Sequence, residues 1–200
     1  MNPLTGERVL LREFQLEDVE DVFAYASDPE VAQHMEWAPH PDREATLAHL
    51  HTCIEAYERR IWYPLAVQRR DSGRVVGSID LRIVSAGHRV GETGYVLAQS
   101  QWGQGINLEM GRLMLAFGFD DVGLNRIQSI CNVENRRSYR TLEKLGLSRE
   151  GTLREFRIEK GAARDKYMYA ILASEWRRDH PRPAAEPARA LEKELGHTRR

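Results

Sequence analysis

Two glycines, Gly103 and Gly105, stand where a strand-like run ends and a helical run begins, in the stretch QWGQGINLEM. Such a junction presents free backbone N–H groups and the positive end of a helix to an anion, and glycine lets a phosphate approach the main chain closely. A tight strand-to-helix turn without a ligand would have the same pattern. Leu108 replaces the third glycine of a dinucleotide-binding turn, and no Gly-Lys-Ser/Thr follows as in a P-loop.

A second candidate cluster lies at the predicted start of a later helix, where Asn135 precedes Ser138 by three positions. Asparagine is a good N-cap, and a hydroxyl in the first turn of a helix can satisfy free backbone donors. These roles explain both residues without any chemistry. A catalytic or ligand-binding role for them therefore needs a further argument.

The histidines do not indicate a metal site. His49 and His51 are two apart on a predicted helix and so point in different directions, and the other five histidines form no ligand spacing with Asp, Glu or Cys. Cys53 and Cys131 are isolated, which favours two free thiols in a reducing compartment. We therefore expect no metal and a cytoplasmic location.

The composition excludes several partner classes. The 200 residues carry a formal net charge of −1, which gives no general attraction to nucleic acid or to membranes. No basic stripe is interleaved with the aromatic residues, and no run approaches about 18 uninterrupted apolar residues. We expect a soluble protein with neither a nucleic-acid partner nor a membrane partner.

The hydrophobic period changes along the chain ahead of the glycines. Residues 7–14 alternate like a strand, and residues 15–28 and 43–60 have helical spacing. Residues 62–70, 74–84 and 88–98 then alternate with period two and are joined by short turns. Short connections favour antiparallel neighbours, so these three segments predict an antiparallel sheet that leads into the glycine turn.

The elements after the glycines complete one domain. Ile106, Met110, Leu113, Met114 and Phe117 form a single buried helix stripe. Residues 124–133 predict a strand, 134–146 a helix, and 149–161 with 164–176 a final hairpin. We therefore expect one domain at residues 1–176 and a proline-marked C-terminal tail at residues 177–200.

Four spaced features carry a resemblance to a known family: Gly94-Tyr95, the Trp-Gly-Gln-Gly turn at 102–105, Asn135 with Ser138, and the motif EKLG followed by Glu150-Gly151. Together they make residues 91–165 similar to the core of the GNAT superfamily of N-acetyltransferases, in the branch resembling ribosomal-protein N-terminal acetyltransferases. The resemblance extends from about Thr5 to Trp176. Any one of the four features alone would be weak.

The resemblance implies a mixed α/β fold and a cofactor. The fold is a mostly antiparallel central sheet of about seven strands, splayed around acetyl-coenzyme A and flanked by helices. The turn would hold the pyrophosphate, and the preceding strand end would bond the pantetheine like an added strand. The implied cofactor-binding residues are Val96, Leu97, Trp102, Gly103, Gln104, Gly105, Ile106, Asn107, Asn135 and Ser138. Asn107 departs from the usual Gly or Ala, and its side chain would crowd or reshape the turn.

The resemblance also implies catalytic roles. Transfer of acetyl to an amine requires removal of a proton from the amine, a donor for the oxyanion, and in some cases a proton for the departing thiolate. Glu92 lies where related proteins carry a general base, although it also suits an exposed strand face, and Glu155 is the second candidate base. Ser138 is the implied proton donor because Leu142 stands where many branches have a tyrosine.

The acceptor stays open at this stage. In this family the acceptor groove lies between the early helices and the final hairpin, which implies a substrate-binding role for Glu36, Trp37, Glu155 and Tyr167. The mixed charges of this groove are compatible with a peptide N-terminus, a small amine or an antibiotic amine. The sequence is also compatible with a homodimer. Two alternatives remain: an acyl-coenzyme A-binding sensor with little turnover, and an enzyme that uses a larger donor such as succinyl-coenzyme A.

Overall fold

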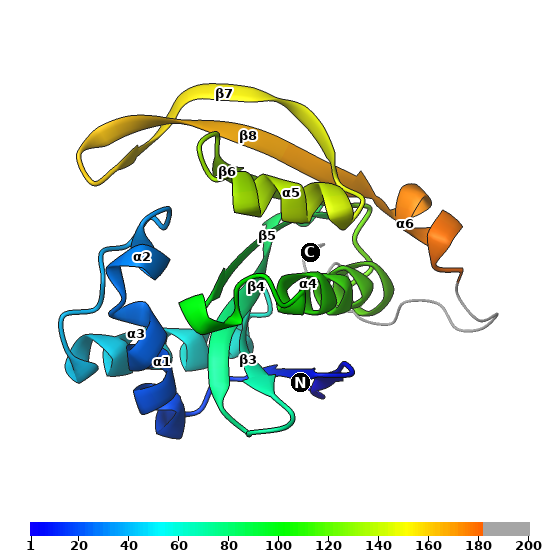
Figure 1. Ribbon diagram of the computed structural model, residues 1–200. Helices are drawn as coiled ribbons and strands as arrows, with labels where there is room; N and C mark the ends of the chain where they lie inside the picture. Colours follow the sequence, from blue (N-terminus) through cyan, green and yellow to red (C-terminus); the bar gives the residue numbers. More distant parts are fainter. Residues whose placement is uncertain (182–200) are drawn as a thin grey trace, which may run out of the picture.

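One open sheet runs through residues 1–181, the part of the chain that the computed structural model describes. The eight strands of this part follow the order β1-β2-β3-β4-β5-β6-β8-β7, and every neighbouring pair except β5 and β6 is antiparallel (Figure 1). The strands are β1 (Leu4–Thr5), β2 (Val9–Glu13), β3 (Trp62–Arg69), β4 (Val75–Ser85), β5 (Val90–Leu97), β6 (Arg126–Asn132), β7 (Ser148–Glu159) and β8 (Ala162–Leu172). The predicted mostly antiparallel sheet is confirmed, and the two-residue β1 brings the strand count to eight in this part.

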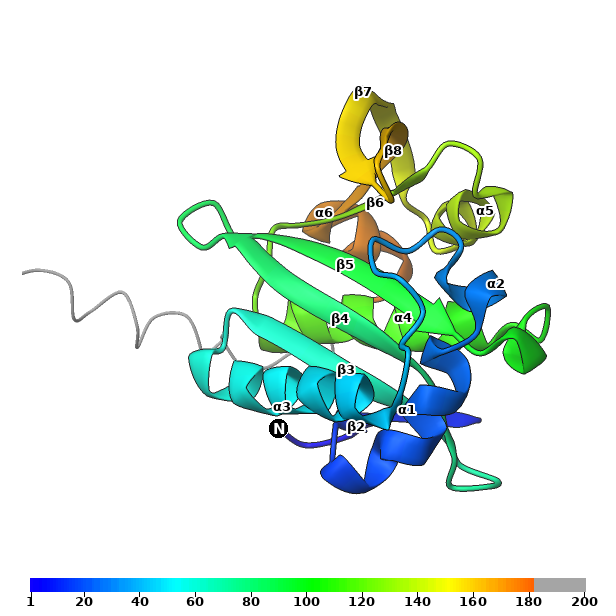
Figure 2. The same cartoon turned by 90° about the vertical axis from the view of Figure 1, so that its left-hand side faces the viewer.

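Helices cover both faces of the sheet. They are α1 (Val19–Ala26), α2 (Pro29–Ala32), α3 (Arg43–Arg59), α4 (Ile106–Ala116), α5 (Arg136–Lys144) and α6 (Ala173–Asp179). Figure 2 shows α3 in front of the strands and α4 behind them. On the α4 side, Ile106, Met110 and Met114 have no exposed surface and Phe117 is buried, so the predicted helix stripe is confirmed at these positions, while Leu113 is partly buried. On the α1 and α3 side, a second core contains Val22 and Leu50.

The sheet parts between β5 and β6. Their parallel pairing consists of Val90 with Arg126, Gly91 with Ile127 and Glu92 with Gln128. Beyond Glu92 the strand β5 continues to Leu97 beside β4 alone. Backbone groups on the β6 side of residues 93–97 therefore have no strand partner in the sheet, and a short 3-10 helix, Gln99–Gln101, leads from this free edge to the glycine turn.

The end of the final hairpin differs from the sequence-based expectation. Strand β8 stops at Leu172, and residues 173–176 begin α6 instead of extending the hairpin. The Leu172 N–H donates to Glu175 Oε2 at 2.9 Å, a cap that starts the helix. Helix α6 therefore contains Trp176 and ends at Asp179. The remainder of the predicted tail, residues 182–200, lies outside the described residues.

None of the helices in residues 1–181 combines the length and the apolar character that crossing a bilayer requires.

Candidate active site

The backbone of the glycine turn has a positive φ at two positions, a conformation that favours glycine. Gly103 and Gly105 both have φ of 75°, in the left-handed region where a Cβ is strained. A Cβ placed on Gly103 would have no atom within 4 Å, so open space lies beside it. Helix α4 begins directly after Gly105, and its first N–H groups have no partner within the helix. The turn thus offers backbone donors and the positive end of a helix to an anion.

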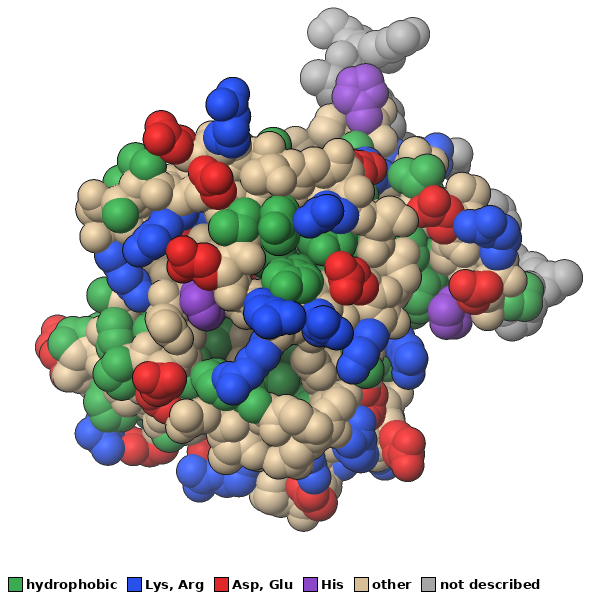
Figure 3. Space-filling view, turned by 45° about the horizontal axis from the view of Figure 1, so that its top comes forward, with side chains coloured by type: hydrophobic (Ala, Val, Ile, Leu, Met, Phe, Trp, Pro, Cys, Tyr) green, Lys and Arg blue, Asp and Glu red, His purple; other side chains and the backbone are tan. Residues whose placement is uncertain are grey.

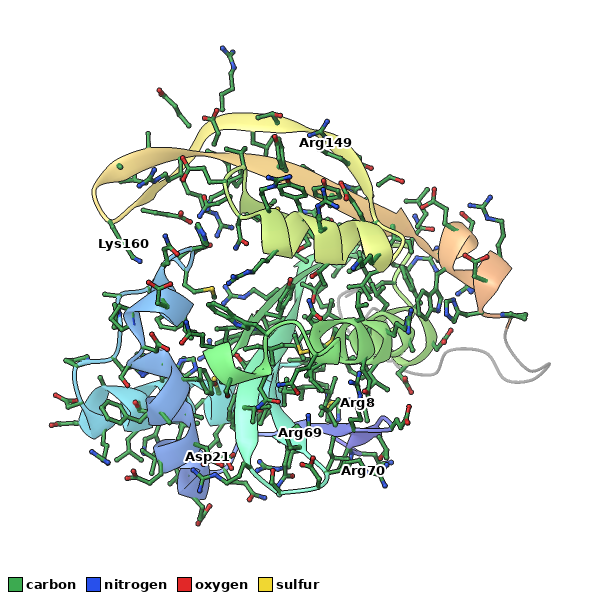
Figure 4. The ribbon with its side chains drawn as sticks, viewed as in Figure 1. Arg8, Asp21, Arg69, Arg70, Arg149 and Lys160 are labelled. Atoms are coloured by element: carbon green, nitrogen blue, oxygen red, sulfur yellow. The ribbon has the colours of Figure 1, made fainter. Side chains whose placement is uncertain are left out.

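Arg8 fixes the turn from its outer side. Its guanidinium donates to Gln104 O at 2.7 Å and to Gly105 O at 3.3 Å, while its Nε donates to Glu109 Oε2 on α4 at 2.8 Å. Glu109 also accepts from the backbone N–H of Arg8. Figure 4 labels Arg8 close to α4. Because these bonds hold the carbonyl groups of the turn, they restrict how its N–H groups can rotate.

A cavity of about 680 Å³ lies beside this turn, and we call it the turn cavity. It is lined by eight of the residues predicted to bind the cofactor: Val96, Leu97, Trp102, Gly103, Gly105, Asn107, Asn135 and Ser138. Its wall also carries four cationic side chains of α5: Arg136, Arg137, Arg140 and Lys144. Basic side chains likewise gather around a hollow on the face drawn in Figure 3. The cavity therefore combines a free strand edge, a glycine turn and positive charge.

Three of the predicted cofactor residues have other contacts. Ile106 is fully buried in the core, and Gln104 donates from its amide to Ser100 O at 2.7 Å, so neither side chain lines the cavity. Asn107 turns toward α5, where its amide donates to Thr141 Oγ1 at 2.6 Å. Its side chain thus ties α4 to α5.

A second cavity of about 470 Å³ also borders β5, and we call it the carboxylate cavity. It is lined by Glu92 and Asp80 from the sheet and by Trp37 and Glu36 from the loop after α2. The two cavities share six lining residues: His34, Met35, Tyr95, Val96, Asn135 and Ser138. A group bound in one cavity can therefore contact a group bound in the other.

Ser138 lies on this shared wall. Its backbone N–H is capped by Asn135 Oδ1 at 3.1 Å, and its side chain forms a hydrogen-bonded group with Tyr95. Burial raises the pKa of the Tyr95 phenol, although hydrogen bonds from Thr141, Ser138 and Asn107 oppose the shift. The phenol therefore stays protonated at neutral pH. Two hydroxyls that can donate a proton thus stand together at the junction of the cavities.

Glu92 faces the carboxylate cavity at the point where the sheet parts. Its Oε2 accepts from Gln128 Nε2 at 3.0 Å, and its Oε1 lies 3.6 Å from a guanidinium nitrogen of Arg157. Arg157 also pairs with Glu36, so one guanidinium on β7 links the two carboxylates across the cavity. About a fifth of the Glu92 side chain is exposed. A carboxylate held in this way can accept a proton from a group in the cavity.

Asp80 is a second carboxylate on the same wall. Its Oδ2 accepts from Trp62 Nε1 at 2.7 Å and from Arg82 Nε at 3.1 Å. Burial raises the pKa of Asp80, and the bonds from Trp62 and Arg82 oppose that shift. In the sheet Asp80 pairs with Gly94, and Arg82 pairs with Glu92. Asp80 and Glu92 are therefore diagonal neighbours on one face of the β4–β5 pair, a relation in which the Cα atoms lie roughly 7–8 Å apart.

Two predicted substrate residues lie away from both cavities. Glu155 is exposed on β7, where its N–H donates to Asp165 Oδ1 at 2.8 Å. Tyr167 packs between Tyr139 and Tyr169, with ring centroids 5.8 Å and 6.5 Å away. The other two, Glu36 and Trp37, line the carboxylate cavity. Within residues 1–181 no group of three His, Cys, Asp or Glu side chains is arranged to hold a metal ion.

Sequence reasoning missed Asp80, Tyr95 and Arg8. The period-two pattern of residues 74–84 places Asp80 and Arg82 on the same face of one strand, and this pairing of an acid with a base could have indicated Asp80 as a site residue. Tyr95 enters the sequence analysis only through the Gly94-Tyr95 motif, because nothing local shows that its hydroxyl reaches the next helix. Arg8 acts on residues about 97 positions later in the chain, so no short motif could identify it.

Comparisons with known proteins agree with this geometry. Residues 8–148 match the family described as acetyltransferase (GNAT) domain. The N-acetyltransferase p20 of Bacillus licheniformis is 31% identical over 180 residues, which cover 88% of this chain and 99% of p20. YdaF of Bacillus subtilis, named as a candidate ribosomal N-acetyltransferase, is 30% identical over 52% of this chain and 57% of its own length. A GNAT acetyltransferase structure from Bacillus anthracis superposes with a TM-score of 0.79 at 28% identity, over 86% of this chain and 99% of the other.

These matches define the class of the protein as an acetyltransferase. The chain belongs to the GNAT family, as its sequence motifs predicted.

Proposed function

We propose that the protein transfers an acetyl group from acetyl-coenzyme A to a primary amine by direct attack, with both substrates bound together. The observation that carries this proposal is the shared wall of the two cavities, since Tyr95, Val96 and Ser138 line both. The turn cavity would hold the donor and the carboxylate cavity the acceptor. The amine then meets the acetyl group beside β5.

The residues of the turn cavity fit acetyl-coenzyme A. The open space beside Gly103 leaves room for a pyrophosphate against the backbone, and the free edge of residues 93–97 offers partners for an amide-bearing chain. Trp102 Nε1 donates to Leu97 O at 2.9 Å, which anchors the end of this edge beside the turn. Arg136, Arg137 and Arg140 would face further phosphates. When bound, the cofactor would supply the thioester whose carbonyl carbon the amine attacks.

Glu92 would act as the base in this proposal, directly or through a water molecule. Its contact with Gln128 holds one oxygen in place, while the weaker 3.6 Å contact with Arg157 leaves the other free to exchange partners. The guanidinium also disfavours a second positive charge nearby, which helps an ammonium lose its proton. Glu155 has no contact with either cavity, so we assign the role to Glu92.

Ser138, supported by Tyr95, would give a proton to the departing sulfur. Both hydroxyls stand on the shared wall, and Asn135 fixes the first turn of α5 on which Ser138 lies. Because a thiolate leaves tolerably well unaided, this assistance is worth less than the removal of the amine proton.

The experiment compares Glu92→Gln with Glu155→Gln, which makes the same change outside the cavities. Coenzyme A affinity is measured by calorimetry, and thiol release is measured with a panel of amines between pH 6 and pH 10. We expect Glu92→Gln to keep coenzyme affinity, to lose roughly 10²-fold in kcat/KM near neutrality, and to recover at high pH where free amine exists in solution. Glu155→Gln should match the unaltered protein.

Two outcomes would count against the proposal. Full activity of Glu92→Gln at neutral pH would remove the assigned base. Coenzyme binding without thiol release for every amine would instead favour a binding module, and a clear preference for succinyl-coenzyme A would change the donor.

A further inference from the structure

Four flat rings form a continuous wall inside the carboxylate cavity. Phe14 contacts His49 with ring centroids 6.4 Å apart, His49 contacts His40 at 5.7 Å, and His40 contacts Trp37 at 5.5 Å. All four line the cavity, although they come from the segment after β2, from α3 and from the loop after α2. The fold thus assembles from distant segments a surface suited to a flat apolar group.

The two imidazoles of this ring wall are neutral. Burial lowers the pKa of His40 and of His49, and the nearness of His40 lowers that of His49 further. His40 Nδ1 shares a hydrogen bond with Thr46 Oγ1 at 2.9 Å, and His49 Nε2 contacts Cys53 Sγ at 3.5 Å. One ring nitrogen of each imidazole is thus engaged with a neighbour, and the rings form an uncharged lining at neutral pH.

The charged end of the cavity lies on the sheet. Gly94 is exposed between Glu92 and Val96, and a Cβ placed on it would lie 3.2 Å from Asp80 Oδ1. Trp62 and Arg82 both bond Oδ2 of Asp80, so Oδ1 faces the gap above Gly94. The gap is therefore flanked by the carboxylates of Asp80 and Glu92. Arg82 and Arg157 balance part of their charge, and the carboxylate oxygens at the gap can accept hydrogen bonds from one ammonium group.

The β7–β8 hairpin closes this cavity on the side of α2. Lys160, at the hairpin tip, donates to Ala32 O at 2.7 Å, and Figure 4 shows it pointing toward α2. Arg157 pairs with Glu36 in the loop after α2, and Asn132 donates to His34 O at 3.4 Å. These contacts restrict the approach of a folded protein, and a volume of about 470 Å³ suits a small molecule.

We infer that the acceptor is a small primary amine joined by a short chain to an aromatic ring, with its ammonium beside Asp80 and Glu92 and its ring against the wall of Phe14, His49, His40 and Trp37. This inference rests on the proposed function. In the transfer, the amine nitrogen bonds to the thioester carbon and the carbon–sulfur bond breaks. The ammonium loses its first proton to the base before the attack. The nitrogen loses a second proton after the attack, and this loss balances the proton that the departing sulfur takes up with its electron pair.

The test measures acetylation of 2-phenylethylamine, butylamine, spermidine and a hexapeptide with a free N-terminal serine. We expect kcat/KM for 2-phenylethylamine to exceed that for butylamine and the peptide by about tenfold or more, because the ring alone contacts the wall. Trp37→Ala should remove most of this advantage, because it should lower kcat/KM for 2-phenylethylamine much more than kcat/KM for butylamine. Phe156→Ala truncates an aromatic side chain outside both cavities and should preserve the preference.

The outcomes separate this inference from the proposed function. Preference for spermidine or for the peptide would overturn the inference while the proposed function stands. An equal loss for all four amines in Trp37→Ala would also overturn it, because that result indicates a structural role for the indole. Acetyl-coenzyme A binding without turnover of any amine would refute the proposed function and the inference together.

Discussion

Replacing Gly103 by alanine tests whether the turn cavity holds phosphate. Gly103 has φ of 75°, and Gly73, in the β3–β4 turn, has φ of 71°. An L-residue in this region costs about 1–2 kcal/mol, so Gly103→Ala and Gly73→Ala should lose similar stability. In a domain of this size each kcal/mol lowers Tm by about 2–4 °C.

The two variants should differ in coenzyme affinity. Only Gly103 lines the turn cavity, and its added methyl group would occupy the open space beside the backbone. Losing one hydrogen bond to a charged phosphate costs about 1.5–3 kcal/mol, and 1.4 kcal/mol is a factor of ten. Calorimetry with coenzyme A should therefore give a Kd about 10- to 150-fold higher for Gly103→Ala and an unchanged Kd for Gly73→Ala. An unchanged Kd in both, with matching Tm values, would refute a phosphate site at this turn.

Two further changes probe the proton donor and a buried ion pair. Ser138→Ala should lower kcat by about tenfold to a hundredfold with little change in amine KM, and an unchanged kcat in steady-state assays would leave Ser138 with its helix-start role alone. Glu159, buried with Lys166, has a pKa lowered by hydrogen bonds from Lys166 and Asn132, against burial, which alone would raise it. Its stabilising effect is present above the unfolded pKa of about 4.3 and is lost as pH falls through the lower folded pKa. In urea unfolding, Glu159→Gln should lower the free energy of unfolding by about 3–5 kcal/mol at pH 7 and by less below pH 4. A loss that does not change with pH would contradict a stabilising ion pair between ionised Glu159 and Lys166.

Much of the sheet could be predicted from local pattern. The strands from Trp62 to Leu97 alternate with period two and have turns too short for a crossover, so their antiparallel pairing follows from the sequence. The end of β8 was harder to place, because apolar residues continue through Trp176. Strand β8 ends where the side chain of Glu175 caps the start of the next helix, α6.

The candidate site was only partly predictable. The glycine turn and Ser138 came from motifs, since closely spaced glycines before a helix have a local backbone meaning. The ring wall could not be predicted, because Phe14 and His40 meet His49 only after α3 has packed on the sheet. The same holds for Asp80, whose partner Trp62 lies on a neighbouring strand. Contacts of this kind depend on the tertiary fold.

The short pairing between β5 and β6 has a consequence for how the molecule unfolds. Three residue pairs join the strands β1–β5 to the strands β6–β8 within the sheet. Such a seam is a natural boundary between cooperative units, so we expect amides near it to exchange through openings smaller than global unfolding. A ligand that bonds the free edge of β5 and contacts α5 would bridge both units. Its binding energy would then couple them, and the substrate would act as a missing strand that makes the protein unfold as one unit.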